Sequence, residues 1–302
     1  MSNSKLYYLH CLSPVHIGTG QGVGVVDMPI MRERITQWPL IPGSSMKGVQ
    51  REHFRRLKQP DAWLDAAFGK SGDDGNAGAF VLTDSRLLAF PVASRYGTFA
   101  YVTCPLALKR LYRDAKSTGV YLPDLDLNAL ESKLGIQSRK QQGESALVTE
   151  DSKIDHEQMI HIDEFRCAAI EDQAFHEWAT WMSEELFSDP LSRDMFMERI
   201  MLVSDDAFQH FVTMCCEIVP RIRIDKENKT VESGALWTEE YLPVESILYG
   251  IVWCDKIHGS SQSITVQQLL GVLSEEMILQ VGGNTTVGKG RIRCRFSKEA
   301  SV

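Results

Sequence analysis

Residues 281–296 read VGGNTTVGKGRIRCRF, a glycine-rich loop followed by arginines that alternate with apolar residues. The start of this stretch fits the P-loop pattern G-x-x-x-x-G-K, but Gly290 stands where a P-loop has Ser or Thr. A P-loop also opens a helix, whereas the period-two alternation of residues 291–296 predicts a strand with one arginine face. The pattern therefore disfavours an ATP site. It leaves open a tight connection without ligand, or a glycine loop that another phosphate backbone can approach.

The hydropathy pattern of the rest of the chain predicts an α+β order of elements. Residues 6–12 alternate as a buried strand, and residues 218–243 resemble an exposed hairpin that turns at Lys226–Lys229. Residues 135–160 are polar and predict a mobile insertion. This order is compatible with a ferredoxin-like core or with two half-copies of it. Strands are also predicted over 79–92, 246–255 and 290–296, and helices over 45–58, 105–119, 172–187 and 265–278, the last with Met277 facing inward.

The helix predicted over residues 45–58 carries a basic stripe. Pro42 and Gly43 break the chain before it, and Ser44 or Ser45 can cap its first turn. Such a stripe is either a solvated face or a surface for a polyanion. Its cations fall on one side of the helix: Lys47, Arg51, Arg55 and Lys58.

Charge is distributed unevenly along the chain. The net charge of −8 argues against bulk attraction to nucleic acid. Residues 1–58 nevertheless carry eight Lys/Arg against three Asp/Glu, and residues 280–302 carry five against one, while residues 144–206 carry seventeen acids against four bases. A fold that joins the two basic ends would create a nucleic-acid surface, with the acidic middle facing away from it.

Cysteine usage and apolar runs indicate a cytoplasmic protein. The seven cysteines include no C-x-x-C pair, so neither a disulfide framework nor a zinc knuckle is predicted. No apolar run approaches the roughly 18 residues of a membrane helix, and the N-terminus has no signal-peptide pattern. We expect a soluble chain with reduced thiols.

Asp27 is the main candidate for chemistry. It is the only acidic residue among the first 32, between a glycine-rich run and the apolar MPI. It is either a turn-forming Asp or a carboxylate that binds a metal ion or acts as a base. His16 is a possible neighbour. Trp237 and Tyr241, on the predicted hairpin, are suited to pack on another subunit or to stack on a base.

Three segments together resemble a known family. They are LSPVHIGTGQGVGVVDMPIMRE (12–33), WPLIPGSSMKGVQRE (38–52) and VGGNTTVGKGRIR (281–293). In this order they resemble the RAMP superfamily of CRISPR–Cas proteins, and more closely the repeated backbone subunit of the type III-B (Cmr) effector complex. The hairpin GALWTEEYLP (234–243) is also similar, whereas residues 60–200 carry little recognisable signal.

The resemblance implies a single RRM-like, ferredoxin-like palm over residues 1–302. It implies insertions at 60–80 as a flexible loop, at 113–200 as a polar and helical lobe, and at 220–246 as a protruding β-hairpin thumb. Copies of such a subunit stack along the guide RNA as a helical filament together with the other subunits of the complex. Each thumb interrupts the duplex of guide and single-stranded target RNA and leaves a flipped nucleotide.

The resemblance also assigns roles to residues. Asp27 matches the carboxylate required for metal-dependent cleavage of target RNA, with Mg²⁺ or Mn²⁺ held loosely. His16, Tyr241 and the thumb residues Trp237, Glu239 and Glu240 are expected to shape that site, and which of the two glutamates corresponds is open. Guide binding is expected at Ser45, Lys47, Arg51, Gly282, Gly283, Gly288, Lys289 and Gly290, with the arginine-faced strand after the loop holding the RNA backbone.

The expected activity is that of an endoribonuclease within the assembled complex. With one isolated carboxylate and no nucleophilic serine motif, the 2′-hydroxyl of the target RNA becomes the nucleophile, and His16 or Tyr241 assists proton transfer. Two alternatives stay open: a purely structural guide-binding subunit, and, less favoured, a guide-processing endoribonuclease of the same superfamily.

Overall fold

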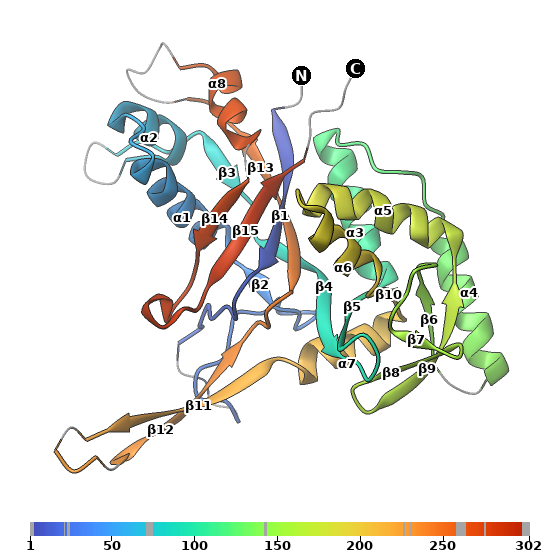
Figure 1. The fold of residues 1–302 in the computed structure, drawn as a ribbon. Helices are drawn as coiled ribbons and strands as arrows, with labels where there is room; N and C mark the ends of the chain where they lie inside the picture. Colours follow the sequence, from blue (N-terminus) through green and yellow to red (C-terminus); the bar gives the residue numbers. More distant parts are fainter. Residues whose placement is uncertain are drawn as a thin grey trace.

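The computed structural model describes residues 3–20, 22, 25–70, 75–141, 144–225, 227–229, 231–257, 264–274 and 276–297. A large mixed sheet runs through this part of the chain, helices cover both of its faces, and a two-stranded hairpin projects away from it (Figure 1). No helix of the described part has the length and apolar content to cross a membrane.

The palm is an antiparallel sheet built around β1 (Ser4–Cys11). β1 pairs with β15 (Arg291–Phe296) on one side and with β13 (Ile247–Cys254) on the other. β13 in turn pairs with β3 (Phe80–Leu82) and β4 (Ser85–Ala93). The spatial order β15, β1, β13, β4 is that of a ferredoxin-like core, in which the fourth, first, third and second core strands of the chain lie side by side. The predicted α+β, ferredoxin-like palm is thus confirmed.

Both faces of β1 are buried, which explains its nearly continuous apolar sequence. Tyr7 and Leu9 pack into one hydrophobic core with α1 (Gly43–Arg56), α2 (Asp61–Phe68) and α8 (Val266–Gly271). Leu6 and Tyr8 pack into a second core with helices of the lobe. The palm sheet therefore lies between two helical layers (Figure 1).

The lobe continues the sheet beyond β4. Its strands follow in the spatial order β5, β10, β6, β9, β8 and β7. The bounds are β5 (Phe99–Thr103), β6 (Ser145–Val148), β7 (Asp155–His156), β8 (Met159–Ile162), β9 (Phe165–Glu171) and β10 (Ile200–Leu202), with helices α3 (Pro105–Thr118), α4 (Leu127–Gln141), α5 (Gln173–Leu186), α6 (Pro190–Met197) and α7 (Asp205–Met214).

The thumb consists of β11 (Glu217–Ile224) and β12 (Val231–Tyr241), which pair antiparallel. It extends from the body at the side where the chain leaves β1 (Figure 1). The predicted hairpin and the position of its turn are confirmed, although Lys226 itself lies outside the described residues. One bulge between Ile222 and Ile224 shifts the register near the tip.

The segment after Thr265 differs from its prediction. Thr265 caps α8 with a capping box as expected, but the helix ends at Gly271, a short 3-10 turn follows, and β14 (Met277–Gln280) pairs with β15. Met277 and Leu279 are buried while Ile278 faces outward, a period of two that the edge position of β14 imposes. The predicted helix to residue 278 is wrong there.

Three other predictions need correction. Residues 61–68 of the expected flexible loop form α2, whose Leu64 and Phe68 pack into the core, and residues 71–74 lie outside the described residues. The expected mobile insertion at 135–160 instead contains β6, β7 and the first half of β8. Neither Ser44 nor Ser45 caps α1, because the helix already begins at Gly43 and both serines lie within its first turn; the Asp84 carboxylate accepts from the Gly43 amide at 2.9 Å instead.

Candidate functional site

Asp27 lies exposed at the base of the thumb, fixed to the edge of β12. Its Oδ2 accepts hydrogen bonds from the backbone N of Thr238 at 2.7 Å and from its Oγ1 at 2.9 Å. These two bonds, the backbone one first, lower the pKa of Asp27 below its ordinary value. The carboxylate is thus ionised and oriented, and its Oδ1 receives no hydrogen bond from the described residues.

The loop that carries Asp27 is clamped to the thumb by Glu240. One carboxylate oxygen of Glu240 pairs with Arg32 at 2.6 Å, and the other accepts from the Ile30 amide at 3.0 Å. Met28 adds a parallel bridge to Glu239. Because both Glu240 oxygens are occupied by the loop, this glutamate holds the position of Asp27 and is unavailable to a ligand.

Glu239 belongs to a different network, which joins the thumb to the glycine loop. Its Oε1 accepts from the indole N–H of Trp237 at 2.9 Å. Its Oε2 accepts from the Tyr241 hydroxyl and, at 2.9 Å, from the amide of Asn284, and Arg221 lies 3.6 Å away. Burial opposes ionisation of Glu239, but these donors outweigh it and its pKa is lowered. The two adjacent glutamates therefore have distinct roles.

His16 and Tyr241 are enclosed by protein. Tyr241 is fully buried, and burial together with Glu239 raises its pKa to about 12. His16 is 6% exposed, its Nδ1 donates to the Glu240 carbonyl at 2.7 Å, and its ring lies 5.4 Å from that of Tyr241. Lys289 covers the Tyr241 ring at 4.8 Å. The structure thus brings His16, Tyr241, Glu239 and Lys289 together, with Asp27 outside this cluster.

The proton-transfer role of His16 and Tyr241 stays a prediction. A general acid or base must reach the proton that it transfers. A Cβ at Gly18 would come within 2.8 Å of His16 Nε2, so a glycine at position 18 leaves room for this ring. Both side chains also contact the thumb, His16 through the Glu240 carbonyl and Tyr241 through the Glu239 carboxylate.

The glycine loop connects β14 to β15, and two of its glycines are required by the protein itself. Gly282 (φ +83°) approaches the His16 carbonyl, and a Cβ there would lie 2.2 Å from that oxygen. Gly290 (φ +80°) would place a Cβ 2.0 Å from the Val281 carbonyl. A Cβ added at Gly288 (φ +82°) would have no atom within 4 Å, so the outer side of this glycine is open. The Gly283 amide donates to the His16 carbonyl at 2.8 Å.

A groove of about 530 Å³ separates the glycine loop from α1. His53 and Arg56 of α1 line one wall, and Thr285, Gly288 and Arg291 line the other. Burial and the charge of Arg56 lower the pKa of His53, so its ring is neutral at pH 7. The exposed Arg291 side chain makes no ion pair with the described residues, whereas Arg56 pairs with Glu52 of the same lining at 3.2 Å, so Arg291 is the open cation of the described lining. The two basic ends of the chain therefore meet here, which was the condition for a joint nucleic-acid surface.

Several cations of the predicted RNA surface are already paired. Arg51 donates to the Gly69 carbonyl at 2.7 Å and pairs with Asp65 at 3.0 Å. Arg293 pairs with Glu276 at 3.3 Å and with Asp189 of the lobe at 3.4 Å, and Arg295 lies 3.8 Å from the same glutamate. The expectation that the whole arginine face of β15 holds a phosphate backbone is therefore wrong, because acidic residues neutralise all of it but Arg291.

The other α1 candidates remain on the helix surface. Lys47 is half-buried, burial lowers its pKa, and it has no ion-pair partner among the described residues. Ser45 is also half-buried. Lys58 lies past the end of α1 with a left-handed φ of 60°, so the predicted stripe is interrupted before it.

The donor set at the thumb base fits a loosely held divalent ion and not a protein cage. Within the described part of the chain, no group of three or more His, Cys, Asp or Glu side chains is arranged to hold a metal. Mg²⁺ is commonly held by one or two carboxylates together with substrate phosphates and water. The exposed Asp27 carboxylate is suited to that mode.

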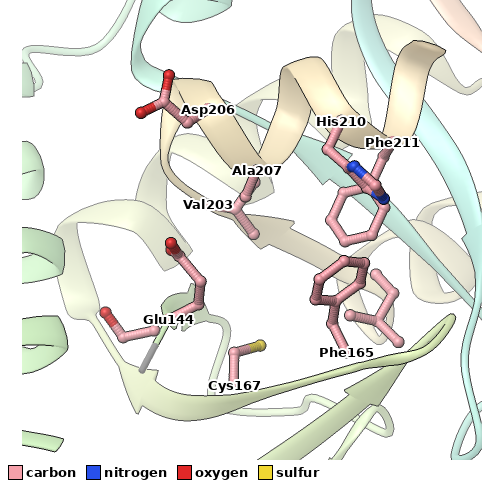
Figure 2. A pocket seen from close by; sticks show the side chains of 10 residues that line it. Glu144, Phe165, Cys167, Val203, Asp206, Ala207, His210 and Phe211 are labelled. Atoms are coloured by element: carbon pink, nitrogen blue, oxygen red, sulfur yellow. The ribbon is translucent and has the colours of Figure 1, made fainter. Parts of the chain in front are cut away.

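A separate pocket of about 230 Å³ lies in the lobe between α7 and β9 (Figure 2). Phe165, Val203 and Phe211 form apolar walls, and the carboxylates of Glu144 and Asp206 stand at its edge. It shares no residue with the thumb base or the groove. Its negative charge is unsuited to a phosphate backbone.

Comparison with known proteins defines the family. The model of the RAMP superfamily matches residues 8–293, nearly the whole chain. The chain therefore belongs to the RAMP superfamily.

Within that superfamily its relatives are Cmr4 proteins. The chain is 33% identical over 289 residues to the CRISPR system Cmr endoribonuclease Cmr4 of Pyrococcus furiosus, covering 94% of this chain and 92% of that one. It is 23% identical to the CRISPR system CMR subunit Cmr4 of Saccharolobus solfataricus, over 97% and 96% of the two chains. The crystal structure of oligomeric Cmr4 from Pyrococcus furiosus superposes with a TM-score of 0.71, at 27% identity and 97% coverage of both chains. The resemblance inferred from the motifs is confirmed.

Three residues that support the site were not predicted from the sequence. Each of them holds one acidic side chain in place: Thr238 holds Asp27, Arg32 holds Glu240 and Asn284 holds Glu239. These contacts span 45 to 211 positions of the chain. Of the three, Asn284 alone has a local sequence signal: an asparagine within a glycine-rich loop is often left-handed.

Proposed function

We propose that the chain is the repeated backbone subunit of a type III-B CRISPR RNA-guided complex in the cytoplasm, and that the assembled complex cleaves complementary target RNA at the thumb base. The observation that carries the proposal is one exposed, oriented carboxylate, Asp27, on a chain whose groove between α1 and the glycine loop presents Arg291, a cation without an ion pair among the described residues. The 33% identical relative is named an endoribonuclease, and a 27% identical one is described as oligomeric, which supports self-association.

In this proposal residues 1–302 act as one palm domain with the lobe and thumb as insertions. The guide RNA lies along α1 and the glycine loop. Arg291 and Lys47, which have no ion-pair partner among the described residues, contact its phosphates, and the open side of Gly288 admits its backbone. Phosphate contacts do not depend on the base sequence of the RNA. A subunit that accepts any guide requires contacts of this kind. Trp237, half-exposed at the thumb base, is placed to stack on a displaced base.

The proposed reaction is an internal transesterification. The 2′-oxygen of the target nucleotide attacks the adjacent phosphorus, and the bond from phosphorus to the 5′-oxygen breaks. The 2′-hydroxyl proton passes to solvent and the leaving oxygen gains one, giving a 2′,3′-cyclic phosphate and a 5′-hydroxyl. The thumb aligns the two oxygens about the phosphorus.

Asp27 is the residue that would hold a divalent ion, Mg²⁺ or Mn²⁺, at this phosphate. When bound, such an ion stabilises the negative charge that develops on the phosphate oxygens. Thr238 orients the carboxylate for this task, while Glu240 and Arg32 fix the loop that carries it.

Reconstitution with guide RNA and a complementary target tests the proposal. We expect self-association along the guide and target cleavage at regularly repeated positions, lost on addition of EDTA. Regular assembly without any cleavage would indicate a purely structural subunit. Processing of precursor guide RNA by the isolated chain would contradict the proposal and favour a guide-processing enzyme.

A further inference from the structure

Asn284 combines an unusual backbone with two side-chain hydrogen bonds. Its φ of 60° and ψ of 28° are left-handed, a conformation that glycine and asparagine adopt readily. Its amide donates to Glu239 Oε2 and to the Tyr241 hydroxyl, both at 2.9 Å. The Tyr241 hydroxyl donates to the same carboxylate, so the three side chains form a closed ring. Glycine would satisfy the backbone alone, so the amide group has a separate purpose.

On the thumb side, strand β12 connects this ring directly to Asp27. Thr238, the residue before Glu239, binds the Asp27 carboxylate through both its backbone N and its hydroxyl. Met28, next to Asp27, bridges to Glu239 itself. A displacement of Glu239 along the strand therefore moves the partner of the Asp27 carboxylate with it.

On the other side, the residue after Asn284 lines the groove. Thr285 and Gly288 form the groove wall opposite α1. The Asn284 carbonyl accepts from the Val287 amide at 3.1 Å and from the Lys289 amide at 3.3 Å, so the loop closes on this residue. Asn284 thus stands between the surface that faces the polynucleotide and the buried carboxylate of the thumb.

We propose that Asn284 is a positioning residue that couples occupancy of the groove to the placement of Asp27. A polynucleotide bound against the glycine loop restrains Asn284. Asn284 in turn restrains Glu239 and Tyr241 through its hydrogen bonds, so the part of β12 that contains Thr238 is held in place. The inference rests on the proposed function, since it takes the groove as the guide site and Asp27 as the cleavage carboxylate. Linkage requires that fixing the thumb base also favours guide binding.

Three variants isolate the amide group. Asn284→Gly keeps the left-handed backbone and removes both hydrogen bonds. Asn284→Asp keeps the size but turns an oxygen toward the Glu239 carboxylate. Asn284→Asp combined with Glu239→Gln exchanges donor and acceptor, so it restores a bond that each single change removes. Gln158→Gly is the matched control, an exposed amide residue in the same backbone conformation (φ 61°) on the lobe.

Two readouts separate coupling from general damage. The first is hydrogen exchange of residues 235–241 in the full chain before and after addition of guide RNA alone. The second is the rate of target cleavage at saturating RNA. In the wild type and in Gln158→Gly, we expect guide RNA to increase protection of residues 235–241. In Asn284→Gly we expect the guide to bind without this added protection, and cleavage to fall by about 100-fold, as misplacement by an ångström can cause.

The double variant should regain part of the protection and of the rate. Wild-type protection and wild-type cleavage in Asn284→Gly would overturn the inference, as would equal loss in the double variant and in Asn284→Asp. Failure of the proposed function gives a different result: an Asp27→Asn complex that still cleaves, or a wild type that does not bind guide RNA. Thermal unfolding of each variant excludes loss of fold as the cause.

Discussion

The thumb base and the α1 groove are both polar, but their polar groups are partnered in opposite ways. At the thumb base, Glu239 and Glu240 are less than 10% exposed and every carboxylate oxygen has a protein donor. In the groove, Arg291 is exposed and unpaired among the described residues, and Gly288 leaves its side open. A closed network fixes one geometry, whereas an open cation accepts any polyanion. The first therefore suits chemistry at one phosphate, and the second suits sequence-independent binding.

The largest effect is expected from Asp27→Asn, which removes charge at the one exposed carboxylate of the thumb base. Loss of one group that stabilises transition-state charge should slow target cleavage by about 10³-fold or more. Guide affinity should stay unchanged, because Asp27 does not line the groove. Single-turnover cleavage assays measure the effect, with Asp194→Asn, an exposed lobe residue, as control.

Tyr241→Phe tests whether the thumb base is as closed as its contacts indicate. The change removes one donor to the buried Glu239 carboxylate and the acceptor of the Asn284 amide. Leaving buried polar groups without partners typically costs about 1–3 kcal/mol of unfolding free energy. Urea unfolding measures the loss. Tyr121→Phe, at a tyrosine that is 71% exposed, should change little; equal stability of the two variants would contradict the closed network.

Arg291→Ala and Arg293→Ala form the corresponding test of the groove. They are two positions apart on one strand, but only Arg291 lacks a partner among the described residues, while Arg293 pairs with Asp189 and Glu276. Removal of one phosphate contact to single-stranded RNA should reduce the slope of log K against log salt by about 0.7. We expect this reduction for Arg291→Ala only. The same slope for both variants would place the guide elsewhere.

The smallest expected effect is a dependence of the unfolding free energy on pH, which arises from Glu239 in the closed network of the thumb base. The pKa of folded Glu239 is lowered, so the unfolded chain binds this proton at a higher pH than the folded chain. Its stabilisation is therefore complete above the unfolded value of about 4.3 and is lost as pH falls through the folded value. The difference in unfolding free energy between wild type and Glu239→Gln should shrink below that pH. A constant difference would mean that Glu239 is not held as an ion.

Local sequence patterns were sufficient for much of the fold. The alternation in residues 291–296 predicted β15, and Pro105 and Gly119 marked the ends of α3, where Gly119 is left-handed as a C-cap. The hairpin turn at residues 226–229 separated the thumb strands. These signals are local because turn geometry and strand alternation depend on neighbours in the chain.

The features that were not predicted from the sequence depend on contacts between distant segments of the chain. Asp84 caps α1 from 41 positions away, which no local cap signal indicates. The pairing of Arg293 with Asp189 depends on where the lobe packs, so the arginine face appeared open. The β14 segment has apolar residues that suit a helix or a strand, and only its pairing with β15 decides between them. The site was predicted at Asp27 and missed at Thr238 for the same reason.

The most direct test compares Asp27→Asn and Arg291→Ala in one preparation of the assembled complex, with guide affinity and saturated cleavage rate measured for each. We predict that Asp27→Asn abolishes cleavage at wild-type guide affinity, and that Arg291→Ala weakens guide binding but cleaves at the wild-type rate once saturated. If both variants lose the same quantity, the groove and the thumb base do not divide binding and chemistry between them.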